Sequence, residues 1–385
     1  MKILHLADLH LGKIVLGLSM IDDQRHVLNQ ALDLCKREHI KVIIISGDVY
    51  DRSIPPEEAV TLLNSFLSKA ILEDRIQVYV ISGNHDSKER LSCFNGLLEK
   101  AGLFIDASIN KDLSMNKHVI EQNGLKVCLY SLPYIFPGEI RLQSDDPEIK
   151  DFEKAVTKVI ESNSINESEI NILNAHYFVT GNEEPIRSDS ESKTSVGTME
   201  QISYSVFYKF DYVALGHLHC PQHIGREHVR YAGSPLKYSI DEITQNKCFT
   251  VININSKKDI QIEKIEIRPL HDFVCLEGSV EELTNNSEQK DMRITFFKLT
   301  DADHVLNAAA RLKIKYPNYV GLDYININSN IEEGEGTLEK VEGFSELSPD
   351  QQFDKFFNFI NEKDMNEIQK KAIKDAFEKL DKEEN

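Results

Sequence analysis

Basic residues are scarce in this sequence of 385 residues. The sequence contains 44 Lys and Arg residues but 63 Asp and Glu residues, which gives a formal net charge of −19. A protein that coats nucleic acid by charge attraction alone would need the opposite balance. If the chain acts on a nucleic acid, bound divalent metal ions, local basic patches or a partner subunit must offset the repulsion.

Long apolar runs and paired cysteines are also missing. No apolar run reaches the roughly 18 residues that a membrane-spanning helix needs. The N-terminal segment MKILHLADLH carries an Asp and a His where a secretory signal would be apolar. The six cysteines are scattered without a CxxC pair, which is typical of reduced thiols rather than of a disulfide framework or a zinc ribbon. We therefore expect a cytoplasmic protein without a targeting segment.

The first two thirds of the chain repeat one pattern, in which a short apolar run rich in Val and Ile stops at polar residues. Such runs indicate buried strands of a layered α/β structure. The runs are 2–7, 42–46, 78–82, 170–175 and 212–215. Amphipathic helices are predicted at about 22–38 and 56–74, so the first three runs indicate a βαβαβ array. Ligand sites of open α/β sheets lie at the carboxyl ends of the strands, so the polar residues after these runs are expected at one place.

The polar residues at the strand ends form a candidate metal site. They are Asp8, His10, Asp48, Asn84, His176, His217 and His219. Hydrolysis of a phosphodiester needs a deprotonated water, an offset for the charge that develops on the phosphoryl oxygens, and a stabilised leaving oxygen. Two divalent ions about 3.5–4 Å apart can meet all three needs. The mixture of carboxylate, imidazole and amide ligands favours Mn²⁺ or Fe²⁺ over Zn²⁺ or Ca²⁺.

Single residues in this region also have simpler explanations. A His after a buried strand, such as His176, can cap a hydrogen-bond network. His5 lies within the first apolar run, and we interpret it as a core or supporting residue rather than a ligand. Three of the candidate ligands follow a glycine, and these glycines are expected to allow tight turns over the strand ends. They are Gly47, Gly83 and Gly216.

The remaining third of the chain contains smaller units. Short alternating strands within 222–267 are expected to be antiparallel and to close a second sheet. Residues 271–328 are predicted to form a small α+β domain, and the acidic, Gly-containing stretch 329–343 indicates a linker. Residues 344–385 are predicted to form a helical hairpin, which begins with a capping box at Ser348. Its apolar stripe can pack on its own domain, but so short a hairpin has little core of its own, which favours binding to a partner.

The order D-x-H, G-D, G-N-H-D, H, G-H-x-H, with each piece at the end of an apolar run, resembles the calcineurin-like metallophosphoesterase superfamily over about residues 1–235. The resemblance implies an α/β fold in which residues 1–270 form a two-sheet sandwich flanked by helices. It also implies two metal ions. One would be held by Asp8, His10, Asp48 and His219, and the other by Asp48, Asn84, His176 and His217, so that Asp48 bridges them.

In that family pattern the residues after Asn84 take part in catalysis. His85 would be the general acid that protonates the leaving oxygen, and Asp86 would assist it through the second ring nitrogen. The simpler explanation is that His85 only orients the site.

A finer resemblance extends over the whole chain. The segments GDVYDRSIPP (47–56), SGNHDS (82–87) and YAGSPLKYSIDE (231–242) are similar to the SbcD family, the nuclease subunits of bacterial SbcCD exonucleases. This resemblance implies Mn²⁺-dependent double-strand exonuclease and single-strand or hairpin endonuclease activity in DNA repair, recombination and replication. One departure is Tyr50-Asp51-Arg52, where some relatives carry a second His; Arg52 could supply a cation there.

The same resemblance implies partners. The chain would form a homodimer through helices near 90–101, its 271–328 domain would cap the active site and help to hold DNA, and its 344–385 hairpin would bind the ATPase subunit SbcC. The segment 181–199 is expected to be a mobile loop near the site, with its charges solvated by default.

Two other functions fit parts of the sequence. A phosphatase or cyclic-nucleotide diesterase of the same superfamily would act on small molecules, but such an enzyme would not need residues 271–385. A DNA-tethering scaffold would use the metals only structurally. The complete ligand set argues against the scaffold, because sites that have lost their function usually lose ligands.

Overall fold

The computed structural model describes residues 1–191, 200–285 and 289–325, together with 351–353, 355, 357, 365–367, 369–371 and 373. The chain divides into two compact units, Met1–Ile325 and Asn326–Asn385. The predicted linker at 329–343 lies outside the described residues, as does most of the predicted hairpin at 344–385. Within the described part of the chain, no helix is both long and apolar enough to cross a membrane.

The first of two six-stranded sheets contains the N-terminal strands. β1 (Lys2–Leu6), β4 (Val42–Ser46), β5 (Gln77–Ile81) and β6 (Leu103–Asp106) run parallel, as the βαβαβ pattern predicts. On the other side of β1, the sheet is extended by an antiparallel hairpin of β15 (Cys248–Ser256) and β16 (Asp259–Glu266).

The expectation that this hairpin closes the second sheet is wrong. The side chains of β15 alternate between two cores: Phe249 and Val251 pack with the helices, while Ile252 and Ile254 pack between the sheets. A strand buried on both faces fits beside β1, which is buried in the same way.

The second sheet has the strand order β13-β14-β12-β9-β8-β7. Its inner strands are parallel and its two edge strands are antiparallel to their neighbours. The strands are β7 (Asn116–Gln122), β8 (Leu125–Leu132), β9 (Ile170–His176), β12 (Tyr212–Gly216), β13 (Gln222–Ile224) and β14 (Arg226–Tyr231).

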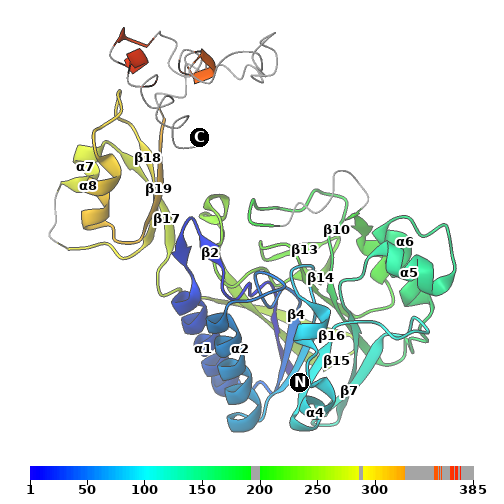
Figure 1. Cartoon of the computed structure of the whole chain (residues 1–385). Helices are drawn as coiled ribbons and strands as arrows, with labels where there is room; N and C mark the ends of the chain where they lie inside the picture. The colour runs from blue at the N-terminus through cyan, green and yellow to red at the C-terminus, as the bar shows by residue number, and fades with distance from the viewer. Residues whose placement is uncertain are drawn as a thin grey trace. The chain divides into compact units, whose positions relative to one another are not determined.

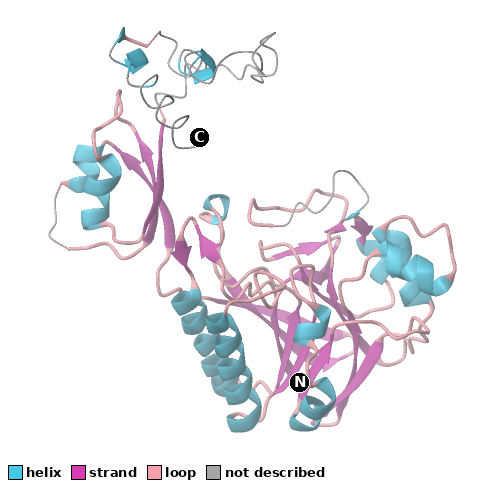
Figure 2. Ribbon diagram, in the orientation of Figure 1, coloured by secondary structure: helices cyan, strands magenta, loops and turns pink. Residues whose placement is uncertain are grey.

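The two sheets stack face to face. Along their strands, side chains point alternately into the core between the sheets and into the core under the helices. In β1, Ile3 faces the second sheet, whereas Leu4 and Leu6 belong to the core under the helices. The first sheet is covered by α1 (Ile21–Arg37) and α2 (Glu57–Ser68), and the second by α5 (Pro137–Ser144) and α6 (Phe152–Glu161). Figures 1 and 2 show these helix pairs outside the two sheets. The fold is therefore α/β, with two mixed sheets flanked by helices.

Shorter elements connect these layers. They are β2 (Ile14–Val15), β3 (Leu18–Ser19), η1 (Lys69–Glu73), α3 (Lys88–Leu91), α4 (Asn95–Leu98), η2 (Glu99–Ala101), β10 (Val179–Thr180), β11 (Ile202–Ser203), η4 (Tyr204–Phe207) and η5 (Ile240–Glu242).

A third, smaller sheet follows residue 271. β17 (Phe273–Gly278), β18 (Ile294–Leu299) and β19 (Tyr319–Tyr324) are all parallel, with α7 (Val280–Thr284) and α8 (Ala308–Lys315) in the two connections. The predicted α+β class is corrected to α/β here, because parallel neighbours need crossover connections and these two helices lie within them.

Candidate metal centre

Five strand ends bring the predicted ligands to one edge of the sandwich. β1, β4 and β5 of the first sheet end beside β9 and β12 of the second, and the backbone bends sharply there. Asp8, His10, Asp48 and His217 have positive φ angles of 51°, 43°, 48° and 108°. Such angles are unfavourable for residues that carry a Cβ, and they gather at functional sites.

The glycines at these ends have two different roles. Gly47 has a φ of +80° and makes the turn that was expected. Gly83 and Gly216 do not have positive φ angles, so the expected role in tight turns is corrected for them. Because they carry no side chain, they allow a neighbouring segment of the chain to pack directly against their backbone. An added Cβ at Gly216 would overlap the carbonyl oxygen of Ser46, and one at Gly83 would overlap the carboxylate of Asp48.

A first cluster contains Asp8, His10 and His219, whose ligand atoms all lie within 4.8 Å of one another. The Nε2 atoms of His10 and His219 are 3.1 Å apart. Oδ2 of Asp8 is buried and has no hydrogen-bond partner among the described residues. Two imidazole nitrogens and an unpaired carboxylate oxygen that converge in this way fit a shared cation.

A second cluster contains Asp8, Asp48 and His176, again within 4.8 Å. Oδ1 of Asn84 lies 3.0 Å from Nε2 of His176 and 3.2 Å from Nδ1 of His217. Nδ1 of His176 donates to the carbonyl of Ser46 at 2.8 Å, which leaves its Nε2 available to a metal.

Asp8 belongs to both clusters, and Asp48 of the second cluster also reaches the first. Oδ2 of Asp48 is 3.3 Å from Nε2 of His176 and 3.7 Å from Nε2 of His10. Its Oδ1 accepts a hydrogen bond of 2.9 Å from the amide of His85, which fixes the carboxylate. This is the position expected of a ligand that bridges two ions.

Burial governs the charges in both clusters. It raises the pKa of Asp8 to about 7, lowers the pKa of His217 to about 3, and holds the pKa of His10 well below its usual value. Burial alone would raise the pKa of Asp48, but His176 and its other imidazole neighbours keep that pKa well below its ordinary range. Metal binding needs neutral imidazoles and ionised carboxylates. His10, His217 and Asp48 already have these states, whereas Asp8 and His176, whose pKa burial would lower but Asp48 raises to about 9, must give up protons. With those protons released, the seven residues fit two divalent ions.

A family model of calcineurin-like phosphoesterases matches residues 1–221. The chain belongs to this family. Among solved structures, this phosphoesterase is similar to a dimetal phosphatase from Danio rerio, at 11% identity and a TM-score of 0.40, over 70% of this chain and 96% of that one. It is also similar to YfcE, a phosphoesterase from E. coli, at 12% identity and a TM-score of 0.28, over 70% of this chain and 100% of that one.

His85 lies beside the clusters, with its ring centroid 4.8 Å from that of His10. Its Nδ1 is 2.7 Å from the carbonyl oxygen of Asp51. The expected assistance from Asp86 is therefore corrected. The carboxylate of Asp86 accepts from the amides of Gly83, Val49 and Tyr50 at 2.9, 3.1 and 3.0 Å, and so joins the loops after β4 and β5. A buried carboxylate needs several donors, and these loops supply three.

Several residues that hold the backbone of the ligand loops were not identified from the sequence. Gln24 of α1 donates to the carbonyl of His10 at 2.8 Å and accepts from the amide of Gly12 at 3.0 Å. Tyr238 donates to the carbonyl of Leu9 at 2.7 Å. Nothing in the pattern around Gln24 distinguishes it from other residues of an amphipathic helix, whereas Tyr238 lies inside the segment YAGSPLKYSIDE.

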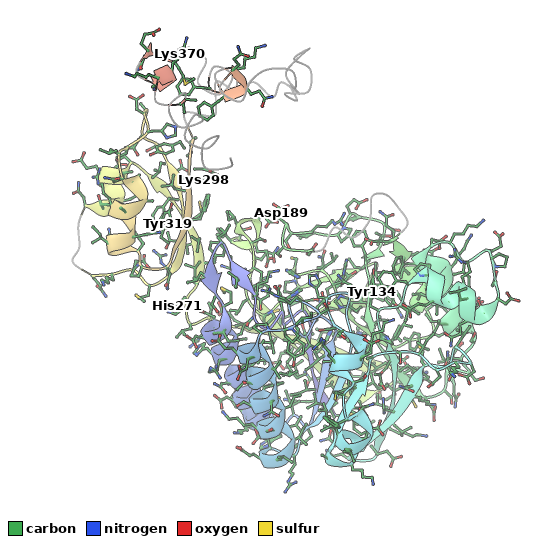
Figure 3. The ribbon with its side chains drawn as sticks, in the orientation of Figure 1. Tyr134, Asp189, His271, Lys298, Tyr319 and Lys370 are labelled. Atoms are coloured by element: carbon green, nitrogen blue, oxygen red, sulfur yellow. The ribbon has the colours of Figure 1, made fainter. Side chains whose placement is uncertain are left out.

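Two aromatic rings and a loop border the clusters. The ring of Tyr134, labelled in Figure 3, lies 6.3 Å from that of His176. The predicted loop 181–199 is described as far as residue 191. Within that part, the guanidinium of Arg187 lies 4.4 Å from the ring of Phe178, which is 6.3 Å from the ring of His217. The described part of the loop therefore approaches the site.

His5 is buried beneath the site. Its Nδ1 is 3.1 Å from the hydroxyl of Tyr212 and its Nε2 is 3.0 Å from the hydroxyl of Ser46. Because Ser46 ends β4 just before Asp48, His5 lies behind the ligands, as expected for a supporting residue.

Proposed function

We propose that this phosphoesterase hydrolyses phosphate diesters with two divalent metal ions, for which Mn²⁺ is the best candidate. The observation that carries the proposal is a pair of adjoining clusters of metal-type ligands, which share Asp8 and which Asp48 links through its contacts with His176 and His10. When bound, two such ions supply an acidified water and offset the charge of the phosphoryl group.

The protein itself supplies a proton donor. A carbonyl oxygen only accepts hydrogen bonds, so the contact between His85 and Asp51 requires a hydrogen on Nδ1 of His85. Nε2 is then the nitrogen that gains and loses a proton, and in the protonated ring it can donate to the leaving oxygen.

For the substrate, we propose DNA, with the chain acting as the nuclease subunit of an SbcCD-type complex. The segments 47–56, 82–87 and 231–242 support this proposal. The chain also continues well beyond the matched residues 1–221, and β17–β19 form a further sheet there. The proposed partner of residues 344–385 is SbcC. DNA binding by SbcC would offset the repulsion between DNA and this chain, whose net charge is −19.

A small phosphodiester or phosphomonoester is the second candidate substrate. The net charge of −19 favours it, because a small substrate needs no extended basic surface.

One assay separates the two substrates. The purified chain with Mn²⁺ is offered a labelled DNA hairpin, a labelled duplex and bis(p-nitrophenyl) phosphate, with and without an SbcC-type ATPase and ATP. Cleavage of the hairpin that requires Mn²⁺, together with duplex cleavage that the ATPase stimulates, supports the nuclease. Hydrolysis of the small diester without any cleavage of DNA would replace the nuclease with the second candidate.

We also propose a homodimer formed through α3 and α4. Phe94 and Leu97 are each 70% exposed there, beside an apolar pocket of about 250 Å³ that Leu91 and Leu98 help to line. Large apolar side chains grouped on a surface mark interaction sites.

A further inference from the structure

A buried ion pair lies behind one of the candidate ligands. Nζ of Lys247 is 2.7 Å from Oε2 of Glu242, and their side chains are 5% and 0% exposed. Removing two charges from water is costly, and such a pair is often no more stabilising than apolar residues of equal volume. The position of the pair therefore calls for an explanation other than stability.

Glu242 faces the ring nitrogen of His219 that points away from the clusters. Its Oε1 lies 3.2 Å from Nδ1 of His219. Oγ of Ser190 is 2.6 Å from the same nitrogen and donates to Oε1 of Glu242. An ionised carboxylate can only accept, so this arrangement places a hydrogen on Nδ1 and directs the lone pair of Nε2 toward His10.

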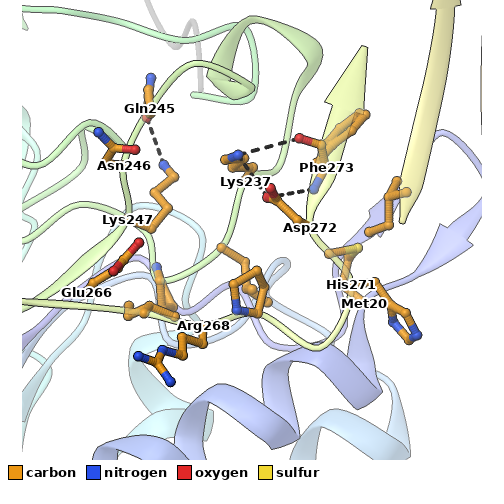
Figure 4. A pocket seen from close by; sticks show the side chains of 15 residues that line it. Met20, Lys237, Gln245, Asn246, Lys247, Glu266, Arg268, His271, Asp272 and Phe273 are labelled. Atoms are coloured by element: carbon orange, nitrogen blue, oxygen red, sulfur yellow. Dashed lines mark hydrogen bonds and ion pairs between the residues drawn. The ribbon is translucent and has the colours of Figure 1, made fainter. Parts of the chain in front are cut away.

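Lys247 holds both the carboxylate and the backbone of the ligand. In addition to Glu242, its Nζ donates to the carbonyl of His219 at 2.8 Å and to the hydroxyl of Ser234 at 2.9 Å. Its Nζ also donates to Oε1 of Gln245 at 2.8 Å, and Figure 4 shows this bond at the wall of a pocket. The pair thus restrains His219 at two points, its ring and its main chain.

We propose that Glu242 and Lys247 are positioning residues that fix the tautomer and orientation of His219, and thereby set the affinity of the metal ion that His219 would hold. The inference rests on the proposed two-metal function. It assigns to Glu242 and Lys247 a role in metal affinity rather than in folding.

Calorimetric titration of the full-length, metal-free protein with MnCl₂ tests the proposal. Glu242→Gln preserves the shape of the side chain but removes its charge. We expect one of the two ions to bind about 10–100-fold more weakly, since partners of metal-binding histidines contribute about that much. The other ion should keep the affinity that it has in the parent protein.

A second variant separates positioning from stability. Glu242→Gln leaves the charge of Lys247 buried without its partner, whereas the double variant Glu242→Gln/Lys247→Met removes both charges. We expect the melting temperature of the metal-free double variant to recover toward that of the parent while the Mn²⁺ affinity stays reduced. Recovery of both quantities would show a purely structural role and overturn the proposal.

The chain offers a matched control at the other end of β12. Lys257 and Asp211 form an ion pair of 2.6 Å there, so Asp211→Asn should leave Mn²⁺ binding unchanged. If Glu242→Gln does not fold, Ser190→Ala can replace it, because it removes only one hydroxyl. This variant should also lower the affinity for the ion that His219 would hold. Parent-like affinity for both ions in every folded variant overturns the inference, whereas a parent protein that binds fewer than two ions overturns the proposed metal centre itself.

Discussion

Asp48 is the residue proposed to bridge the two ions, because its Oδ2 lies within 3.7 Å of an imidazole nitrogen from each cluster. In Asp48→Asn, a neutral amide replaces the bridging carboxylate. The transition state for hydrolysis should lose several kcal/mol of stabilisation, so we expect turnover to be at least about 100-fold slower. Steady-state hydrolysis of bis(p-nitrophenyl) phosphate measures the effect. A DNA-tethering scaffold would still bridge DNA ends after this change, and undiminished hydrolysis would contradict the bridging role.

His85 should affect turnover without affecting metal binding. His85→Ala removes a proton donor but no assigned ligand, so we expect a loss of about 10²–10⁴-fold in rate with unchanged Mn²⁺ stoichiometry. Parallel kinetics and calorimetry separate the two quantities. Full activity in the variant would exclude the general acid, and loss of an ion would show that His85 is itself a ligand.

Metal binding should strengthen as pH rises. In the metal-free protein, burial raises the pKa of Asp8 to about 7. Burial alone would lower the pKa of His176, but Asp48 raises it to about 9. Both groups must lose their protons to bind a metal, so the affinity should rise by about tenfold per pH unit for each proton released. Titrations with Mn²⁺ at about pH 6 and about pH 8 test this, and equal affinities would contradict it.

At the scale of elements, the separation of β4 and β12 is set by Gly216. A Cβ at this position would overlap the carbonyl of Ser46 and lie 2.8 Å from Nδ1 of His176. Gly216→Ala should therefore destabilise the protein by about 1–3 kcal/mol and weaken metal binding. Gly138→Ala is the matched control, because a Cβ at Gly138 of α5 meets only the end of the Arg141 side chain, at 3.8 Å. Denaturant unfolding of both variants provides the comparison, and equal stability would show that the strands can separate without cost.

The five apolar runs predicted their strands to within one residue, because strands buried on both faces consist of continuous apolar sequence. The ligands at their ends could be found for the same reason, since parallel strands end at one edge. The place of the β15–β16 hairpin could not be found, because an alternating pattern does not specify which strand is its neighbour. Nor could Glu242 and Gln24, whose roles depend on hydrogen bonds to residues distant in sequence.

At the scale of the whole molecule, the proposed dimer can be tested by changing one surface. In Leu97→Glu, a charge replaces a side chain that is 70% exposed on α4, and we expect the mass measured by light scattering to fall from that of a dimer to that of a monomer. Leu306→Glu is the control, because Leu306 is 84% exposed and precedes α8 of the third sheet rather than lying on α3 or α4. A parent protein that is already monomeric would refute the dimer.

The position of β1 inside its sheet has a consequence for synthesis on the ribosome. The amino group of Met1 donates to the carbonyl of Ile254 at 2.8 Å, across 253 residues of chain. At about 5–20 residues per second, roughly 12–50 s pass between the translation of β1 and that of β15. During this interval one edge of β1 has no neighbouring strand, and the two histidines that follow β12 have not yet joined Asp8. We therefore expect chaperones to bind and protect the nascent chain until the β15–β16 hairpin has been translated.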